Sequence, residues 1–414
     1  MAIDADVFVI GGGLAGMTAA LAAAEQGATV RLASGAQSTL RQATGLIDVL
    51  GYHDGNLLAN PFAVIADLPE AHPYSIGGKR AVREGLARFD AVTGATYRGD
   101  HTDRNALLPT QGGTVKPTAR YPAGMAAGLA SDERDVLLVG FEQLVDLDAP
   151  FVARSLADRG VPFAVSSATV QLPLDFPSDA TLSRYARALD ADEDGVRDRL
   201  ARRVAAHHDG EPRIGLPAVL GLENAPAVRE HLAAHLDAAV FEVPTGRPSV
   251  PGLRLETQFR TALAAAGVSV VGNEVVDYEA SGDRVEAVTV SRNEQQVRYT
   301  AAEFVLATGG LVGGGLRSDR EVVREAVFDC PVSHPPARGD WSTDDRTESQ
   351  PFATFGVEVE ETLRPLGTDG VRFENLRAAG GVLGGADGAM TGAGSGISLA
   401  TGEKAGRMAG EAVR

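Results

Sequence analysis

Residues 7–16 read Val-Phe-Val-Ile-Gly-Gly-Gly-Leu-Ala-Gly and contain the clearest structural pattern in the sequence. Its first four residues form a continuous apolar run, which is typical of a parallel strand buried on both faces. The pattern Gly-x-Gly-x-x-Gly follows and leads into an Ala- and Leu-rich segment over residues 17–26, which predicts a helix. In such a unit the glycines allow a tight turn and a close approach of backbone to a pyrophosphate, while the helix N-terminus supplies N–H groups. We therefore predict a nucleotide-binding loop with cofactor contacts from Gly11, Gly13, Leu14, Ala15 and Gly16.

The second predicted strand, residues 29–33, lacks an acid at its end. An Asp or Glu is expected there, about 20 residues after the glycines, because it binds the ribose hydroxyls. Here the sequence reads Leu32-Ala33-Ser34-Gly35, and Ser34 offers a hydrogen bond without the strength of a carboxylate. Either FAD binds with a weaker hold on its adenosine, or the ligand is FMN, which has no adenosine. The same absence argues against NAD.

Two later stretches resemble motifs of known flavoproteins. A hydrophobic strand over residues 304–307 ends in Thr308-Gly309-Gly310 and resembles the second flavin motif of proteins with two dinucleotide-binding domains. Residues 375–381 and 392–402 resemble the C-terminal segment of fumarate reductase-like flavoproteins, where a helix N-terminus points at the isoalloxazine and stabilises the negative charge of reduced flavin. The cofactor contacts predicted from these stretches are Thr308, Gly309, Gly310, Gly380, Gly394, Ser395, Gly396 and Ile397.

These motifs lie near the two ends of the chain and predict an α/β, Rossmann-like FAD/NAD(P)-binding fold assembled from N- and C-terminal segments. We expect residues 1–50 and 251–414 to form the flavin-binding domain. Between them, helical stretches alternate with loops that contain Pro and Gly, so we interpret residues 51–250 as an inserted α+β middle domain that binds or covers the substrate. Because we find neither a run of about 20 apolar residues nor a basic leader, we expect a cytoplasmic protein that reaches the membrane only through a partner.

The charge of the chain restricts its partners. The formal net charge is −17, and 35 of the 38 basic residues are Arg. No concentrated basic stripe is present, so nucleic acid is not an expected partner. The acid excess is spread along the chain, which favours adaptation to high salt, since salt screens the repulsion between surface carboxylates. An acidic surface on a protein from a non-halophile is the alternative.

The sulfur and imidazole content predicts no metal centre. The single cysteine, Cys330, excludes a disulfide framework and a Cys-ligated iron–sulfur cluster within this chain, and we interpret it as a structural thiol. Eight His are present, but none belongs to an HExxH pattern. His207 and His208 are adjacent and would point in different directions on a helix, which makes them a poor pair of ligands.

Several longer stretches resemble the B subunit of the bacterial and archaeal anaerobic glycerol-3-phosphate dehydrogenases. They are residues 37–40 (Gln-Ser-Thr-Leu), 44–50 (Thr-Gly-Leu-Ile-Asp-Val-Leu), 112–118 (Gly-Gly-Thr-Val-Lys-Pro-Thr) and 243–255, which begins Val-Pro-Thr-Gly-Arg-Pro. The resemblance covers most of the chain in order. It implies a flavin, FMN with FAD as the alternative, and oxidation of sn-glycerol 3-phosphate to dihydroxyacetone phosphate. It also implies a complex with two further subunits: a catalytic flavoprotein subunit, and an iron–sulfur, membrane-anchoring subunit that passes electrons to quinone.

The resembling stretches also carry cations that suit a phosphorylated substrate, because Arg binds phosphate with two parallel hydrogen bonds. The candidates are Lys116, Arg247 and Arg254, followed by Arg41. Alcohol oxidation further needs a base for the hydroxyl proton. His53, Asp48 and His334 are candidates, and the sequence favours none of them, so the catalytic residue stays unassigned.

Two other functions remain open from the sequence. The chain could be another fumarate reductase-like enzyme, such as a keto-acid or steroid dehydrogenase. It could instead be a non-catalytic electron-transfer or scaffold subunit of the same complex, which the missing ribose acid and the unassigned base both favour.

Overall fold

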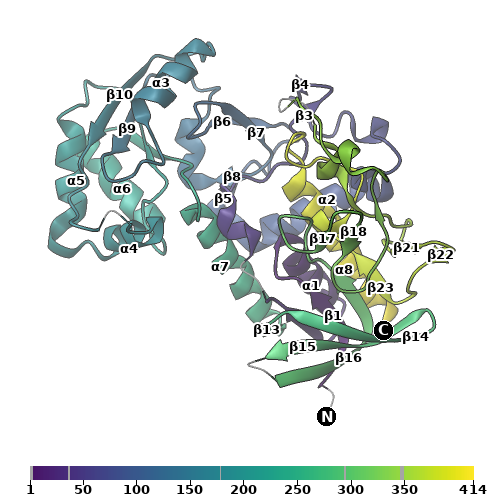
Figure 1. Cartoon of the computed structure of the whole chain (residues 1–414). Coiled ribbons are helices and arrows are strands. Elements are labelled where there is room, and N and C mark those ends of the chain that lie inside the picture. Colours follow the sequence, from purple (N-terminus) through teal and green to yellow (C-terminus); the bar gives the residue numbers. More distant parts are fainter. Residues whose placement is uncertain (1–2, 36–37, 178, 293–294, 346–348) are drawn as a thin grey trace. The chain divides into compact units, whose positions relative to one another are not determined.

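The computed structural model describes residues 3–35, 38–177, 179–292, 295–345 and 349–414 (Figure 1). The chain divides into two compact units. Unit 1 comprises Met1–Thr39, Asp48–Thr93 and Gln258–Arg414, and unit 2 comprises Leu40–Ile47 and Gly94–Thr257. This division differs from the expected one, because residues 48–93 belong to unit 1 and not to an inserted domain. The boundary near residue 257 falls within α7 (Val250–Ala265).

Unit 1 is built on a sheet with the strand order β13-β2-β1-β16-β15-β14, and β23 also pairs with β16. Its parallel strands are β1 (Ile3–Ile10), β2 (Val30–Ala33), β13 (Ser269–Val271), β16 (Gln295–Leu306) and β23 (Leu376–Ala378). Its antiparallel extension consists of β15 (Arg284–Arg292) and β14 (Val275–Ser281). Ile10 of β1 pairs with Leu306 of β16, so both strands end at the same edge of the sheet. The apolar run 7–10 is buried, as expected of a central parallel strand.

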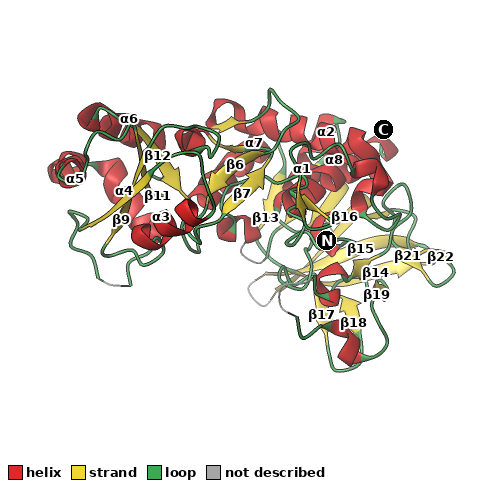
Figure 2. Cartoon of the chain, turned by 90° about the horizontal axis from the view of Figure 1, so that it is seen from above, coloured by secondary structure: helices red, strands yellow, loops and turns green. Residues whose placement is uncertain are grey.

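Three helices of unit 1 pack side by side: α1 (Leu14–Glu25), α2 (Pro73–Thr93) and α8 (Gly394–Ala412) (Figures 1 and 2). Glycines four residues apart allow α8 to approach the backbone of α1. A Cβ on Gly402 would lie 2.5 Å from the Ala15 carbonyl oxygen, and a Cβ on Gly406 would lie 2.0 Å from that of Ala19. α2 packs on α8 in the same way, since a Cβ on Gly85 would lie 2.6 Å from the Leu399 carbonyl carbon. This packing explains why residues 48–93 belong to unit 1.

Unit 2 contains a separate four-stranded sheet with the order β10-β9-β11-β12. All of its pairs are parallel, and its strands are β9 (Val136–Phe141), β10 (Val165–Val170), β11 (Arg213–Pro217) and β12 (Ala239–Val243). The helices of this unit that pack with the sheet or with one another are α3 (Ala149–Asp158), α4 (Leu182–Ala191), α5 (Val196–Ala205) and α6 (Ala225–Leu236). This part is therefore α/β, where α+β was expected. The reason is β9, which is buried at every position and so needs cover on both faces.

Short strand pairs complete the two units. In unit 2 these are β5 (Tyr97–Arg98) with β8 (Tyr121–Pro122), and β6 (Ala106–Pro109) with β7 (Val115–Thr118). In unit 1 they are β3 (Tyr52–His53) with β4 (Asn56–Leu57), β17 (Leu316–Ser318) with β18 (Val323–Glu325), β19 (Val332–Ser333) with β20 (Gly356–Val357), and β21 (Leu366–Gly367) with β22 (Gly370–Val371). None of the helices in the described ranges has the length and apolar composition that a bilayer crossing requires.

Candidate functional site

A groove of about 310 Å³ lies in unit 1 at the edge where β1 and β16 end. Its walls come from segments far apart in the sequence, namely Gly11–Gly13 after β1, Ala33 and Gly35 at the end of β2, residues 273–275 before and in β14, Ala307–Gly309 after β16, and Arg317. Ligands of open α/β sheets bind outside the carboxyl ends of the strands. The groove therefore lies where this fold places a nucleotide.

The glycine loop is shaped by contacts with the end of β16. Gly11 has φ +113°, and a Cβ there would lie 2.2 Å from the Ala307 carbonyl oxygen, so only glycine fits. A Cβ on Gly16 would lie 1.8 Å from the Gly11 carbonyl oxygen, which fixes the close approach of α1. Around Gly13, by contrast, no described atom lies within 4 Å of the Cβ position. Gly13 is thus the position that leaves room for a ligand.

The N-terminus of α1 suits an anion. Its N-cap residue Gly13 makes no side-chain capping hydrogen bond, and the first turn contains no acid. The positive end of the helix dipole is therefore not neutralised by an acidic side chain. It lies at the first N–H groups of the helix, those of Leu14, Ala15 and Gly16. This arrangement fits the pyrophosphate of a dinucleotide.

The second predicted motif contributes an unsatisfied hydroxyl to the groove. Thr308 follows β16, and its buried Oγ1 has no hydrogen-bond partner within the described part of the chain. Gly309 has φ +83°, and a Cβ on Gly310 would lie 2.7 Å from the Gly381 carbonyl oxygen. A buried hydroxyl without a partner costs free energy unless a ligand or water satisfies it. Thr308 thus fits a polar ligand atom.

A carboxylate missing from β2 is supplied from elsewhere in the fold. Glu274 precedes β14 and lines the groove beside Gly35, where a Cβ would lie 2.1 Å from Glu274 Cγ. Ser34, the residue expected to replace the acid, instead faces the glycine loop, because a Cβ on Gly12 would lie 2.1 Å from Ser34 Oγ. Glu274 was not predicted, because it lies outside the end of β2, where the ribose-binding acid was expected. The signal for it is the neighbouring parallel strand β13, which ends at the same edge three residues earlier.

The C-terminal motif meets the glycine loop through Gly380. This residue has φ +76°, and a Cβ there would lie 2.6 Å from Ala15 Cβ. The start of α8, residues 394–397, does not line the groove. There the N–H of Gly396 donates to the Asp48 carbonyl oxygen at 2.7 Å, and the N–H of Gly394 donates to that of Gly388 at 3.3 Å. The α8 N-terminus is therefore partly capped by its own unit and offers fewer donors than expected.

Comparison with known proteins agrees with this geometry. Residues 6–397 match the family described as FAD binding domain. A Halobacterium salinarum protein, named as the probable B subunit of an anaerobic glycerol-3-phosphate dehydrogenase, is 52% identical over 426 residues, which cover 100% of this chain and 99% of that protein. The corresponding Yersinia enterocolitica protein is 32% identical, with 95% of each chain covered. This chain belongs to the B-subunit family of anaerobic glycerol-3-phosphate dehydrogenases. The resemblance stated from the sequence is confirmed.

The match to the FAD binding domain family, together with the B-subunit relatives, identifies the chain as a flavin-dependent oxidoreductase, and that family match indicates FAD as the flavin. The sequence resemblance had implied FMN, with FAD as the alternative, and the family match supports the alternative. A flavocytochrome c3 fumarate reductase of known structure aligns with 99% of this chain and 79% of its own, at 12% identity and a TM-score of 0.46. The groove agrees with FAD, since it runs past the end of β2 to β14, where the adenosine half of a dinucleotide lies and which FMN would leave empty.

Of the predicted bases in this B-subunit chain, His334 has no ring atom left for a substrate. Its Nδ1 donates to the Pro335 carbonyl oxygen at 2.8 Å, and its Nε2 accepts the Val323 N–H at 3.2 Å. Trp341 and Phe355 pack against the ring. His334 is therefore a structural residue of its loop. His53 lies on β3 with its Nε2 3.5 Å from an Asp54 carboxylate oxygen.

Asp48, the other predicted base, is buried next to Tyr74 and the start of α8. The Tyr74 hydroxyl donates to the Val49 carbonyl oxygen at 2.5 Å, and burial, together with the Asp48 charge, raises the pKa of Tyr74 well above the usual value. His72, which the sequence prediction missed, lies beside them and is 4% exposed. Its Nδ1 accepts the Tyr74 N–H at 3.0 Å, and burial lowers the pKa of His72 to about 4.

The predicted phosphate-binding cations of unit 2 divide into two groups. Arg254 donates to both carboxylate oxygens of buried Glu242, at 2.6 and 2.9 Å, and to the Gly221 carbonyl oxygen. Arg41 pairs in the same way with Glu256, which is 3% exposed in its side chain. Both guanidinium groups are therefore engaged by carboxylates within unit 2. Lys116 is partly buried on β7, and Arg247 is exposed.

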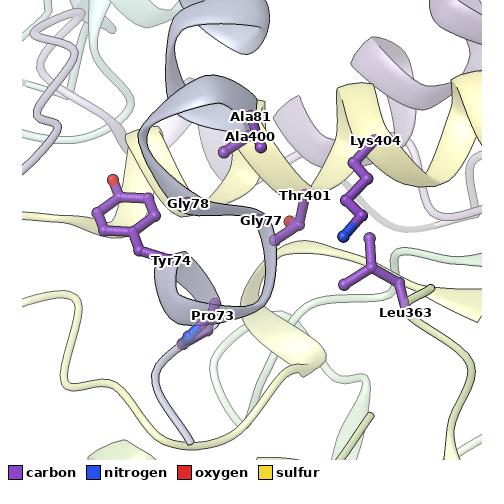
Figure 3. A pocket seen from close by; sticks show the side chains of 9 residues that line it. All are labelled: Pro73, Tyr74, Gly77, Gly78, Ala81, Leu363, Ala400, Thr401 and Lys404. Atoms are coloured by element: carbon purple, nitrogen blue, oxygen red, sulfur yellow. The ribbon is translucent and has the colours of Figure 1, made fainter. Parts of the chain in front are cut away.

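A second cavity, between α2 and α8, is too small for a substrate (Figure 3). It encloses about 10 Å³, which is room for one water molecule. Lys404 lines it, with Nζ donating to the Ile76 carbonyl oxygen at 3.0 Å, and burial lowers the pKa of this lysine. Lys404 therefore joins α8 to the start of α2.

Proposed function

We propose that this chain is the FAD-carrying B subunit of an anaerobic glycerol-3-phosphate dehydrogenase and takes part in oxidising sn-glycerol 3-phosphate to dihydroxyacetone phosphate. The observation that carries the proposal is the dinucleotide groove in a chain that matches its B-subunit relatives along its whole length. The substrate is inferred from the names of those relatives.

The residues present fit FAD at three places. The N–H groups that begin α1 would hold the pyrophosphate, the Thr308 hydroxyl would meet a polar atom of the cofactor, and Glu274 would accept hydrogen bonds from the ribose. When bound, the flavin supplies an acceptor for the hydride of an alcohol. The chain itself orients the cofactor and leaves space for it at Gly13.

We further propose that the chain works in a complex with a catalytic flavoprotein subunit and an iron–sulfur, membrane-anchoring subunit at the cytoplasmic face of the membrane, where electrons pass to quinone. The cysteine content supports this division. Cys330 is 1% exposed, and burial raises the pKa of its thiol well above the usual value, so it is unsuited to bind a cluster. Clusters must then reside in another subunit.

A non-catalytic electron-transfer role is the second candidate. Arg254 and Arg41 are engaged in ion pairs, and both ring nitrogens of His334 are hydrogen-bonded within the protein. Three of the residues predicted to contact the substrate are therefore occupied by protein groups, which favours this role. Addition of glycerol 3-phosphate to the isolated, FAD-loaded chain without oxygen would decide between the two. Loss of the oxidised-flavin absorbance supports substrate oxidation by this subunit. An unchanged spectrum, with bleaching only after the partner flavoprotein subunit is added, supports electron transfer.

A further inference from the structure

Two histidines and one aspartate converge on the surface of unit 2. His231 and His235 lie one turn apart on α6, and Asp198 lies in the first turn of α5. One ligand atom from each residue can be chosen so that all three lie within 4.8 Å of one another. The helices below them are already held together by buried apolar side chains such as Leu200 and Leu232. The triad is therefore not needed to pair α5 with α6.

The hydrogen bonds of His235 leave a lone pair facing Asp198. Its Nδ1 lies 2.8 Å from the His231 carbonyl oxygen, which can only accept, so Nδ1 carries the proton. In the neutral ring Nε2 then has a lone pair, and it lies 3.3 Å from Asp198 Oδ1. Two acceptors face each other at this distance. Such a contact is favourable only if a proton or a metal ion lies between them.

The spacing of these atoms suits a small transition-metal ion. In a tetrahedral site with bonds of about 2.0–2.1 Å, neighbouring ligand atoms are about 3.3–3.4 Å apart. The distance from His235 Nε2 to Asp198 Oδ1 is 3.3 Å, whereas His231 Nε2 lies at 2.7 Å from the same oxygen and would have to move outward. The hydrogen bond from His235 Nδ1 to a backbone carbonyl is also the kind that orients metal-binding imidazoles.

We propose that Asp198, His231 and His235 bind a divalent ion of the Zn²⁺ class. Two imidazoles and one carboxylate are a donor set that zinc accepts, with solvent completing the coordination. The side chains are 48%, 28% and 47% exposed, respectively, so water can reach the ion. The ion would cross-link α5 to α6 in unit 2.

The charges that face the site agree with this assignment. The pKa of Asp198 is lowered, first by the hydrogen bond from His231 and then by the charges of His235, His231 and Arg202, so the carboxylate is ionised at neutral pH. Arg202, one turn further along α5, is the cation that opposes a metal ion here.

The test is a calorimetric titration of the tag-free, full-length chain with Zn²⁺ after treatment with chelator, in molar KCl and excess Mg²⁺. Molar salt screens non-specific attraction to the acidic surface, and Mg²⁺ occupies sites made only of oxygen. We expect one ion per chain, and a loss of affinity of about tenfold or more in His231→Ala, His235→Ala and Asp198→Asn. His207→Ala, at an exposed histidine outside the triad, is the matched control.

Thermal unfolding gives a second readout. An ion that binds only the folded chain raises the melting temperature of the wild type and of His207→Ala, but not that of His235→Ala. Melting curves without metal establish that each variant folds. The proposal is overturned if the wild type binds no Zn²⁺ under these conditions, or if His207→Ala loses as much affinity as the triad variants.

Discussion

Glu274 and Gly35 lie in direct contact at the end of the groove formed by β2 and β14. A Cβ on Gly35 would lie 2.1 Å from Glu274 Cγ and 2.4 Å from the Glu274 backbone nitrogen. The glycine therefore lets the end of β2 meet the segment between β13 and β14. Because β13 and β2 are parallel neighbours, the carboxylate reaches the edge of the sheet that an acid at the end of β2 would otherwise occupy.

We therefore expect Glu274→Ala to weaken FAD binding. Loss of a hydrogen bond to a charged, partly exposed group costs about 1–2 kcal/mol, or roughly a five- to thirtyfold rise in Kd. Quenching of flavin fluorescence measures the Kd for FAD. We expect the binding of ADP to weaken in parallel and the binding of FMN to stay unchanged. Glu286→Ala, at an exposed acid on β15, is the control. An equal loss of FMN affinity would show that Glu274 does not act on the adenosine half.

Gly13→Val should lose flavin binding alone, whereas Gly11→Val should lose both flavin binding and stability. The Gly13 position is open within the described structure, so its valine variant should fold, purify colourless and melt like the apoprotein. At Gly11 the valine would lie against the Ala307 carbonyl oxygen at a positive φ, so that variant should lose stability as well as flavin. Absorbance and melting curves separate the two effects. A fully yellow Gly13→Val protein would mean that the loop does not hold the flavin.

Arg254→Ala should act on stability and not on substrate affinity. Removal of the guanidinium leaves the carboxylate of Glu242, 2% exposed, without its cationic partner. Breaking such a buried pair costs about 3–5 kcal/mol. Denaturant unfolding measures the loss, and Glu242→Gln in the same chain should recover part of it, because the buried charge is then removed. A rise in KM for glycerol 3-phosphate at unchanged stability would instead show that Arg254 binds the substrate phosphate.

The acidic surface predicts a strong dependence on salt. With a net charge of −17, repulsion between carboxylates grows as screening is removed, so the melting temperature should fall when the protein is moved from molar to low salt. Differential scanning calorimetry over a series of KCl concentrations, repeated in sucrose as an uncharged solute, tests this. A melting temperature that stays constant across the KCl series would exclude adaptation to high salt.

Local pattern was enough to predict the loop after β1 and the motif after β16, because each depends on residues close together in the sequence. The close packing of α8 on α1 through Gly402, Gly406 and Gly410 was not predicted and is seen only in the structure. Glu274 could not be predicted in this way, since its place beside β2 depends on the order of strands in the sheet. The ion pair of Arg254 could not be predicted either. The sequence shows that a cation is present, but not that it pairs with the buried carboxylate of Glu242.

His72 gives a prediction about acid stability with a definite sign. Its pKa is lowered by burial to about 4, whereas an unfolded histidine titrates near 6.5. Between about pH 6.5 and 4 the unfolded chain therefore binds a proton that the folded chain does not, and the free energy of unfolding falls as the pH falls through this window. Asp132 contributes in a separate window, because its pKa is lowered to about 2, chiefly by the hydrogen bond from Arg134.

His72→Gln removes the titrating imidazole, so its free energy of unfolding should change less than that of the wild type between pH 6.5 and 4. Urea unfolding in molar KCl at several pH values measures the difference, since high salt reduces the general effect of surface charge. His101→Gln, at an exposed histidine of unit 2, should follow the wild type. If His72→Gln and the wild type lose stability in parallel, the imidazole is protonated in the folded chain as readily as in the unfolded one, and its burial has no energetic consequence at these pH values.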